Sequence, residues 1–181
     1  MMESGAWEED RGGEGGFRLL FVCTGNTCRS PMAEGIARAV LAERGWSGVQ
    51  VRSAGVAAFP GSPISGGAVR AAREGGIEIE GHRSHALTPD LVEGADLILT
   101  MSQSHLAALE AWGVGEKSTL LPTFARGARE IHPDDEVSDP IGGSDELYRA
   151  TFRQLNELIE ASLDRLGPIL EAESSSATTD E

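Results

Sequence analysis

The sequence predicts an α/β fold, a three-layer α/β/α sandwich in which helices flank a four-stranded parallel sheet. Apolar segments of strand type alternate along the chain with segments of helical periodicity, which is typical of a parallel sheet covered on both faces. The first strand segment, residues 17–22, is almost continuously apolar, as expected for a strand in the middle of such a sheet. A loop of small residues joins it to the first helical pattern, and loops at the carboxyl ends of parallel strands are where α/β proteins bind ligands.

The other elements follow from periodicity and from the residues that end each segment. Met32, Ile36 and Val40 recur at helical spacing, and Gly45 ends this first helix. The last helix carries a long apolar stripe, and Gly167-Pro168 is expected to stop it. We expect strands at residues 49–53, 95–101 and 118–121, a helix around residues 68–74, a short helical turn after Thr88-Pro89, and helices at residues 102–112 and from Ser144 onward.

The two ends of the chain differ in composition from its middle. Residues 1–16 carry five acids and one arginine, and residues 169–181 carry four acids and no base, so the ends hold −8 of the net charge of −14. Tails of this composition are usually disordered. We therefore expect a flexible acidic and glycine-rich leader at residues 1–16, a single domain at residues 17–168 and a disordered tail at residues 169–181.

Charge and cysteine content narrow the class of protein. A net charge of −14 argues against nucleic acid or an anionic membrane as a partner. No apolar run approaches the ~20 residues that span a bilayer, and the acidic N-terminus does not resemble a secretory signal. Two cysteines within one loop are no disulfide framework, which favours a reducing compartment. We expect a cytoplasmic monomer without a cofactor. We expect no metal site, since the four histidines lack the spacing of metal ligands (His82, His85, His105 and His132).

The loop after the first strand has the composition of an anion-binding nucleophile site. Cys23 opens it and Arg29 closes it, just before a helix begins. Unpaired N–H groups and the helix dipole attract an anion there, and an arginine can hold two phosphate oxygens. A cysteine among such donors is expected to become a thiolate. The residues expected to bind phosphate are Thr24, Gly25, Asn26, Thr27, Cys28, Arg29 and Ser30.

Individual residues of this loop have simpler explanations as well. Cys23 and Cys28 could be small core residues beside a tight turn. Ser30 could cap the helix, donate a hydrogen bond to the Cys23 sulfur, or do both. Gly25 allows a close approach of the backbone to a ligand. Asn26 tolerates a left-handed backbone, and its amide can hold the loop in shape.

The motif Cys23-x5-Arg29-Ser30 after the first strand resembles that of the low-molecular-weight protein tyrosine phosphatase family. The resemblance extends over residues 17–168 and includes the stretch Ser53-Ala54-Gly55 and a late Asp139-Pro140. It implies a cysteine-dependent protein phosphatase that works on phosphorylated proteins through a phosphocysteine intermediate and releases inorganic phosphate.

The resemblance also assigns roles to residues. Cys23 would attack phosphorus, Arg29 and the loop N–H groups would hold the phosphate oxygens, and Asp139 would act as general acid and then base. Ser53 would support the loop together with Asn26 and Ser30. Asp139 could instead be a turn residue in an acidic loop, where Asp134, Asp135 and Glu136 are expected to be solvated.

Cys28 leaves three alternatives open. It could be a small loop residue whose N–H faces phosphate, a partner of Cys23 in a reversible disulfide as the family arrangement implies, or part of a dithiol redox or metal site. The five-residue spacing speaks against the third. Related arsenate reductases share the loop but need further cysteines downstream, and this chain has none after Cys28.

Two positions bear on the phosphorylated side chain. Tyrosine-specific members usually carry a larger aliphatic residue at the position of Thr27 and aromatic residues after the Asp-Pro pair, where this chain has Ile141-Gly142-Gly143-Ser144. Thr27 together with Gly-Gly-Ser resembles the bacterial protein arginine phosphatase branch, although Ile141 stands where a ring is expected. Phosphoarginine is therefore the favoured substrate and phosphotyrosine the alternative. A phosphoprotein-binding module without turnover would need neither Cys23 nor Asp139.

Overall fold

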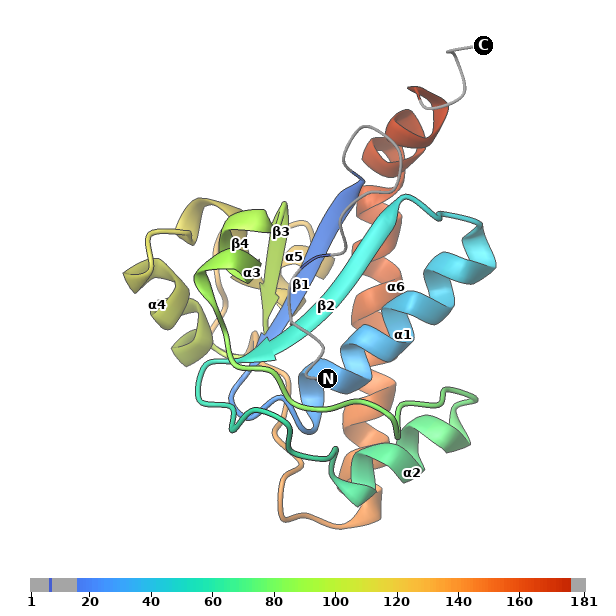
Figure 1. The fold of residues 1–181 in the computed structure, drawn as a ribbon, viewed down its shortest axis with the longest axis vertical. Helices are drawn as coiled ribbons and strands as arrows, with labels where there is room; N and C mark the ends of the chain where they lie inside the picture. The colour runs from blue at the N-terminus through green and yellow to red at the C-terminus, as the bar shows by residue number, and fades with distance from the viewer. Residues whose placement is uncertain (1–6, 8–15, 177–181) are drawn as a thin grey trace.

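The computed structural model describes Trp7 and residues 16–176, which form a four-stranded parallel sheet flanked by helices (Figure 1). The strands are β1 (Phe17–Cys23), β2 (Val49–Gly55), β3 (Leu97–Thr100) and β4 (Ser118–Leu120). Their order in the sheet is β2-β1-β3-β4, and every neighbouring pair is parallel. The chain leaves β1 toward β2 on one side and later returns to β3 on the other, so the strand order reverses next to the carboxyl end of β1. Ligands of open α/β sheets bind at this point. The predicted fold class is confirmed.

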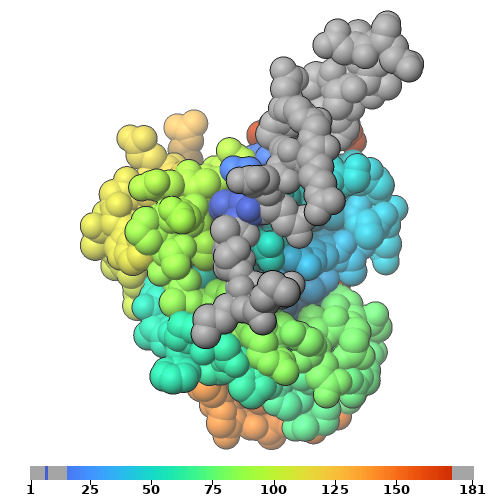
Figure 2. Space-filling view, in the orientation of Figure 1, coloured from blue at the N-terminus to red at the C-terminus, as the bar shows by residue number. Residues whose placement is uncertain are grey.

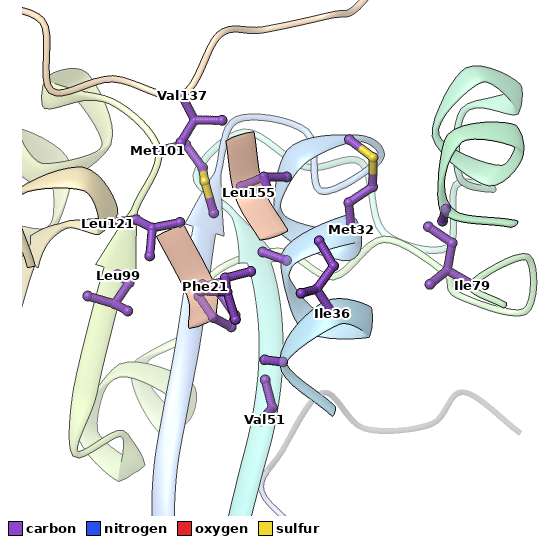
Figure 3. Packing of buried hydrophobic residues seen from close by; sticks show 14 of the residues in the cluster. Phe21, Met32, Ile36, Val51, Ile79, Leu99, Met101, Leu121, Val137 and Leu155 are labelled. Atoms are coloured by element: carbon purple, nitrogen blue, oxygen red, sulfur yellow. The ribbon is translucent and has the colours of Figure 1, made fainter. Parts of the chain in front are cut away.

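Helices cover both faces of the sheet because the buried side chains of β1 alternate between the faces. Leu19 and Phe21 pack under α1 (Arg29–Arg44), α5 (Leu121–Ala125) and α6 (Asp145–Ser176), as Figure 3 shows for Phe21, Ile36 and Leu155. Leu20 and Val22 pack with α3 (Pro89–Gly94) and α4 (Gln103–Ala111) on the other face. The central strand thereby holds the two layers together.

The smaller elements complete the chain. A helix, α2 (Gly66–Glu74), packs against α6, where Gly67 and Gly75 leave room for the rings of Tyr148 and Phe152. Thr88 caps α3 as expected, accepting a hydrogen bond from Leu91 N–H. A short 3-10 turn, η1 (Gly115–Lys117), precedes β4. Helix α5 has no counterpart among the elements expected from the sequence, although Pro122 fits the first turn of a helix.

The predicted end of the last helix is wrong. Helix α6 continues through Gly167 and Pro168 to Ser176. Leu163, Leu166 and Leu170 are all buried, so the apolar stripe continues past the proline and its burial favours the helix over a break. Residues 169–176, expected to be disordered, thus extend α6.

The predicted leader and the end of the predicted tail fall largely outside the described residues. Of residues 1–16 the structure describes only Trp7 and Gly16, and residues 177–181 are not described. Trp7 packs beside the cluster under α3, and its indole N–H donates to the carbonyl of Leu91 at 3.1 Å. Within Trp7 and residues 16–176, no helix combines the length and apolar character that a membrane span requires.

Candidate active site

The strand-loop-helix unit predicted from the sequence is present. Cys23 is the last residue of β1, residues 24–28 turn back, and α1 begins at Arg29. Cys28 occupies the cap position of the helix and makes no side-chain capping bond. The prediction that Ser30 caps this helix is therefore wrong, since Ser30 lies inside the first turn with its hydroxyl turned to the loop.

Cys23 is buried among hydrogen-bond partners. Its Sγ lies 2.8 Å from Ser30 Oγ and accepts a hydrogen bond from Asn26 N–H at 3.3 Å. Burial raises the pKa of the Cys23 thiol, while the bonds to Ser30 and Asn26 and the charge of Arg29 lower it, and burial is the largest of these influences. The donors that favour a thiolate are in place as expected. In this structure, however, desolvation outweighs them.

Arg29 and Asp139 come together from positions 110 residues apart. Arg29 is only 6% exposed, and one of its terminal nitrogens donates to Val137 O at 3.2 Å. The other donates to Asp139 Oδ2 at 3.3 Å. Since the Asp139 side chain remains 44% exposed, it lies between the buried arginine and the solvent. Asp139 is therefore the member of this pair that the solvent reaches.

The long loop that carries Asp139 is fastened to the sheet by buried contacts. Val137 N–H donates to Met101 O at 2.9 Å, just past the end of β3, and Figure 3 shows the two side chains close together. Asp135 accepts hydrogen bonds from the Thr123 hydroxyl at 2.7 Å, from His132 N–H at 2.8 Å, and from the guanidinium of Arg126.

The expectation that Asp135 is solvated is thus wrong. Arg126 chiefly lowers the pKa of the Asp135 carboxyl, to about 2, with help from His132 and Thr123. The sequence does not show this role, because Asp134 and Asp135 are neighbours of the same kind. Only the buried one fastens the loop.

Asn26 connects the loop to the surrounding elements. It has a left-handed backbone, with φ of 54°, as its residue type allows. Its Nδ2 donates to Ser30 Oγ at 2.8 Å and to Ser53 Oγ at 2.9 Å, and its Oδ1 accepts from His85 N–H at 2.9 Å. Asn26, Ser30 and Ser53, the three residues expected to support the loop, are thus joined by hydrogen bonds. The contact with His85 was not predicted, because nothing in the local sequence connects positions 59 residues apart.

His82 and Glu34 extend this network behind the loop. The His82 Nε2–H group donates to Asn26 Oδ1 at 3.1 Å, and Ser53 Oγ donates to Glu34 Oε2 at 2.5 Å. Burial lowers the pKa of His82, so the neutral ring is favoured. The loop is therefore held from behind by a chain of polar side chains.

A second histidine, His105, contacts the start of the loop at Thr24. His105 Nε2 lies 2.8 Å from Thr24 Oγ1, and its Nδ1 lies 3.0 Å from Ser102 Oγ. Burial, followed by the charge of Arg29, lowers the pKa of His105 to about 4. The ring is neutral at physiological pH and positions Thr24. The sequence does not predict this contact between His105 and Thr24, which are 81 residues apart.

The positions tied to selectivity and redox chemistry lie around the loop. Thr27 is partly exposed, and its carbonyl accepts from Ser65 N–H at 3.0 Å. The Cys28 thiol lies 3.2 Å from Ser65 Oγ and 3.7 Å from the Tyr148 hydroxyl. Ile141 is 65% exposed, and its N–H donates to Asp139 Oδ1 at 3.2 Å, which places it beside the acid. Among the residues described, no group of three or more potential metal ligands occurs.

Comparison with known proteins agrees with this geometry. The family model described as low molecular weight phosphotyrosine protein phosphatase matches residues 18–175.

Individual relatives carry two different activities. A protein-arginine-phosphatase of Bacillus subtilis (strain 168) is 42% identical over 143 residues, covering 78% of this chain and 91% of that protein. The low molecular weight protein-tyrosine-phosphatase PtpB of Staphylococcus aureus is 36% identical over 146 residues, covering 78% of this chain and 94% of that protein. Among solved structures, a YwlE arginine phosphatase mutant with a phosphorylated active-site serine superposes with a TM-score of 0.76 at 37% identity, covering 83% of this chain and 96% of that one.

Proposed function

We propose that this chain, which belongs to the low molecular weight phosphotyrosine protein phosphatase family, removes phosphate from arginine side chains of proteins. Its class is that of a cysteine-dependent protein phosphatase. The observation that carries the proposal is the convergence of three groups at one loop. Cys23 ends β1, the buried Arg29 opens α1, and Asp139 pairs with Arg29 at 3.3 Å.

The first step transfers the phosphoryl group to sulfur. The thiolate of Cys23 attacks phosphorus, a sulfur–phosphorus bond forms, and the bond from phosphorus to the substrate nitrogen breaks. Asp139 donates its proton to that nitrogen, so arginine leaves as a neutral or protonated guanidine group. Arg29 and the N–H groups of the loop hold the three equatorial oxygens, whose charge redistributes in the transition state.

The second step restores the enzyme. Water attacks phosphorus, Asp139 takes the proton of that water, and the sulfur–phosphorus bond breaks to leave Cys23 as the thiolate and inorganic phosphate as product. Ser30 stabilises the sulfur in both steps, because its hydroxyl lies 2.8 Å away. Asn26 and Ser53 keep the loop in shape through the hydrogen bond between them.

Phosphoarginine is favoured by residues at the loop and its entrance. Thr27 places a small side chain with a hydroxyl where a bulkier aliphatic group would suit a phenyl ring. Ile141 and the two glycines after it supply no aromatic wall, so a phenyl phosphate would lack stacking contacts worth ~0.5–1.5 kcal/mol per pair. The arginine phosphatase of B. subtilis, 42% identical, supports the same substrate.

Phosphotyrosine remains a second candidate, because the 36% identical relative from S. aureus is a tyrosine phosphatase. Release of phosphate from matched phosphoarginine and phosphotyrosine peptides by the full chain decides between them, with Cys23→Ser as the blank. A preference for phosphoarginine supports the proposal, and a preference for phosphotyrosine contradicts it. If the folded protein releases phosphate from neither peptide, a phosphoprotein-binding module is favoured instead.

We also propose that Cys28 forms a reversible disulfide with Cys23 under oxidants, which protects the nucleophile from irreversible oxidation. Treatment with peroxide followed by mass spectrometry should show a loss of two hydrogens in the loop peptide that dithiothreitol reverses. In Cys28→Ser the same treatment should yield sulfinic or sulfonic acid on Cys23. If the wild type is over-oxidised as readily as the variant, Cys28 has no such role.

The site as proposed needs no metal or cofactor, and we propose that the protein acts as a cytoplasmic monomer on phosphorylated proteins. Analytical ultracentrifugation at micromolar concentration should give a single species of about the chain mass of 19.1 kDa. A concentration-dependent larger species would contradict the monomer.

A further inference from the structure

The side chain of Tyr148, in the first turn of α6, is enclosed by α2 and is 6% exposed. Its ring lies against Gly67 of α2, where an added Cβ would lie 2.4 Å from a ring atom, so that only glycine leaves room for the ring. The next residue of α6, Arg149, pairs with Glu74 of α2 at 2.7 Å. Figure 2 shows the start of α6 (orange) at the lower edge of the molecule, next to α2 (green). These contacts fix the position of the Tyr148 hydroxyl.

The Tyr148 hydroxyl contacts the sulfur of Cys28. The oxygen lies 3.7 Å from Cys28 Sγ, and the Cys28 thiol donates its proton to Ser65 Oγ at 3.2 Å. Because the single thiol proton points to Ser65, the Tyr148 hydroxyl is the donor to the sulfur, which can accept a weak hydrogen bond. Burial raises the pKa of Tyr148, so the hydroxyl keeps its proton at physiological pH. The Cys28 sulfur is therefore held by two side chains, one at the start of α2 and one on α6.

The two cysteines of the loop have different partners. Both are free thiols, and Cys23 Sγ lies 2.8 Å from Ser30 Oγ and 3.3 Å from the amide nitrogen of Asn26. A disulfide would join the two sulfurs at about 2.05 Å and would release both thiol protons. The sulfur of Cys28 would then move toward Cys23 and lose its contact with Tyr148. The contacts of the Cys28 thiol thus stabilise the reduced loop alone.

We propose that Tyr148 is a positioning residue for Cys28, and that its hydroxyl stabilises the reduced loop against the disulfide between Cys23 and Cys28. The inference rests on the reversible disulfide proposed above and adds the residue that sets how readily this disulfide forms. With the hydroxyl in place, mild oxidants leave the nucleophile Cys23 free, and stronger ones close the disulfide.

Glutathione disulfide is an oxidant with which this equilibrium can be measured. The Cys23 thiolate attacks one of its sulfurs, a mixed disulfide forms, and one glutathione leaves as thiolate. Cys28 then gives up its proton, and its sulfur attacks Cys23 Sγ, so that the second glutathione leaves. The two protein thiols lose two electrons, which the glutathione disulfide gains. The contact of Cys28 with Tyr148 is broken in the second step.

Redox titration of the full chain tests the role of the hydroxyl. Wild type and Tyr148→Phe are equilibrated with mixtures of reduced and oxidised glutathione, quenched with acid and alkylated, and the loop peptide is identified by mass spectrometry. Phenylalanine keeps the ring against Gly67 and removes only the hydroxyl. We expect half of Tyr148→Phe to be oxidised at a ratio [GSH]²/[GSSG] about threefold higher than for wild type, the value of one weak hydrogen bond. The measurement does not depend on turnover, so it is separate from the test of phosphatase activity.

Two further variants distinguish the hydroxyl from a general loosening of α6. Ser162→Ala removes another buried hydroxyl of this helix, which donates to the Leu158 carbonyl at 2.7 Å, and should keep the wild-type midpoint. Gly67→Ala keeps the Tyr148 hydroxyl, but its added Cβ displaces the ring, so the midpoint should shift in the same direction as in Tyr148→Phe. Gly67→Ala also replaces Tyr148→Phe in the test if that variant does not fold.

The outcomes separate the role of Tyr148 from the disulfide itself. Equal midpoints for wild type and Tyr148→Phe, or a variant that needs more oxidant, would overturn the role of Tyr148 and leave the disulfide in place. An equal shift in Ser162→Ala would also overturn it, because the effect would then not come from the contact with Cys28. A disulfide that forms in Tyr148→Phe but not in wild type would support the proposal. If neither protein forms the disulfide in fully oxidised glutathione, the disulfide and the role of Tyr148 are both overturned.

Discussion

The hydroxyl of Ser30 lies 2.8 Å from the sulfur of Cys23, seven positions earlier in the chain. This bond is one of the influences that lower the pKa of the Cys23 thiol against the opposing effect of burial. The position of the Ser30 hydroxyl is also fixed by Asn26, whose Nδ2 donates a hydrogen bond to it. The oxygen therefore accepts from the amide and can turn its own proton to the sulfur.

Ser30→Ala should raise the pKa of Cys23 further, since a lowering contribution is lost while burial stays. We expect the pH profile of alkylation by iodoacetamide to move to higher pH and kcat to fall about tenfold, the value of one hydrogen bond to a charged group. Ser144→Ala, at the start of α6, is the matched control and should leave both unchanged. An unmoved alkylation profile in Ser30→Ala would show that the hydroxyl does not act on the sulfur.

Asp139→Asn should lower kcat by ~10²–10⁴, because an amide cannot deliver a proton to the leaving nitrogen. The neighbour Asp134 has a side chain that is 93% exposed, so Asp134→Asn should retain the parent rate. Rates are compared on the phosphoarginine peptide at saturating concentration. Similar rates for the two variants would assign the acid to another residue.

Thr27→Ile should shift the substrate preference from phosphoarginine toward aryl phosphate. A larger aliphatic side chain gives a phenyl ring apolar contact and narrows the space for a guanidinium, and such differences of a few methylenes are worth about tenfold or more in kcat/KM. We expect aryl phosphate turnover to rise and phosphoarginine turnover to fall. Thr27→Ser, which keeps the hydroxyl, should retain the preference for phosphoarginine over aryl phosphate. If neither turnover changes in Thr27→Ile, another residue determines the substrate preference.

Asp135→Asn should destabilise the protein by about 1.5–3 kcal/mol at pH 7, because three donors lose a charged acceptor. The carboxyl has a pKa of about 2 in the fold against an ordinary value of 3.8. Its contribution is therefore present above pH 3.8 and is lost as the pH falls toward 2. Urea unfolding at both ends of this range measures the difference from wild type, which should shrink in acid. A difference that does not depend on pH would mean that the charge of Asp135 is not what fastens the loop.

His105 should remain neutral well below the ordinary pKa of histidine. Burial and the charge of Arg29 lower its pKa to about 4 from 6.5, so its ring resonances should stay unchanged between pH 8 and pH 5 and move only near pH 4. The folded state takes up this proton later than the unfolded chain, and the histidine's contribution to stability is accordingly lost as the pH falls from 6.5 through 4. His105→Gln identifies the resonance by its disappearance. A midpoint near 6.5 would contradict the burial argument.

The sequence predicted the parts of the site that depend on near neighbours. The apolar run, the small-residue loop and the helix stripe of Met32, Ile36 and Val40 are contiguous, so their periodicity alone predicted β1 and α1. Asn26 adopts the left-handed backbone that its residue type tolerates. These features are local, and local preferences act before any long-range contact forms.

Other features depend on segments that meet only in the folded chain. Asp139 reaches Arg29 because Val137 bonds to the end of β3 and Asp135 bonds to Thr123 and Arg126, and none of these contacts leaves a pattern in the sequence. Burial likewise overrode the expected low pKa of Cys23.

The sequence by itself therefore determined the fold class, the family and the identity of the three groups proposed for the chemistry. Only the tertiary structure decided how these groups are held. It joined His82 and His85 to Asn26 and continued α6 past Pro168. The physical reason is that hydrogen bonds and burial depend on distance in space, and positions 56 to 110 residues apart acquire that distance only when the sheet brings their segments together.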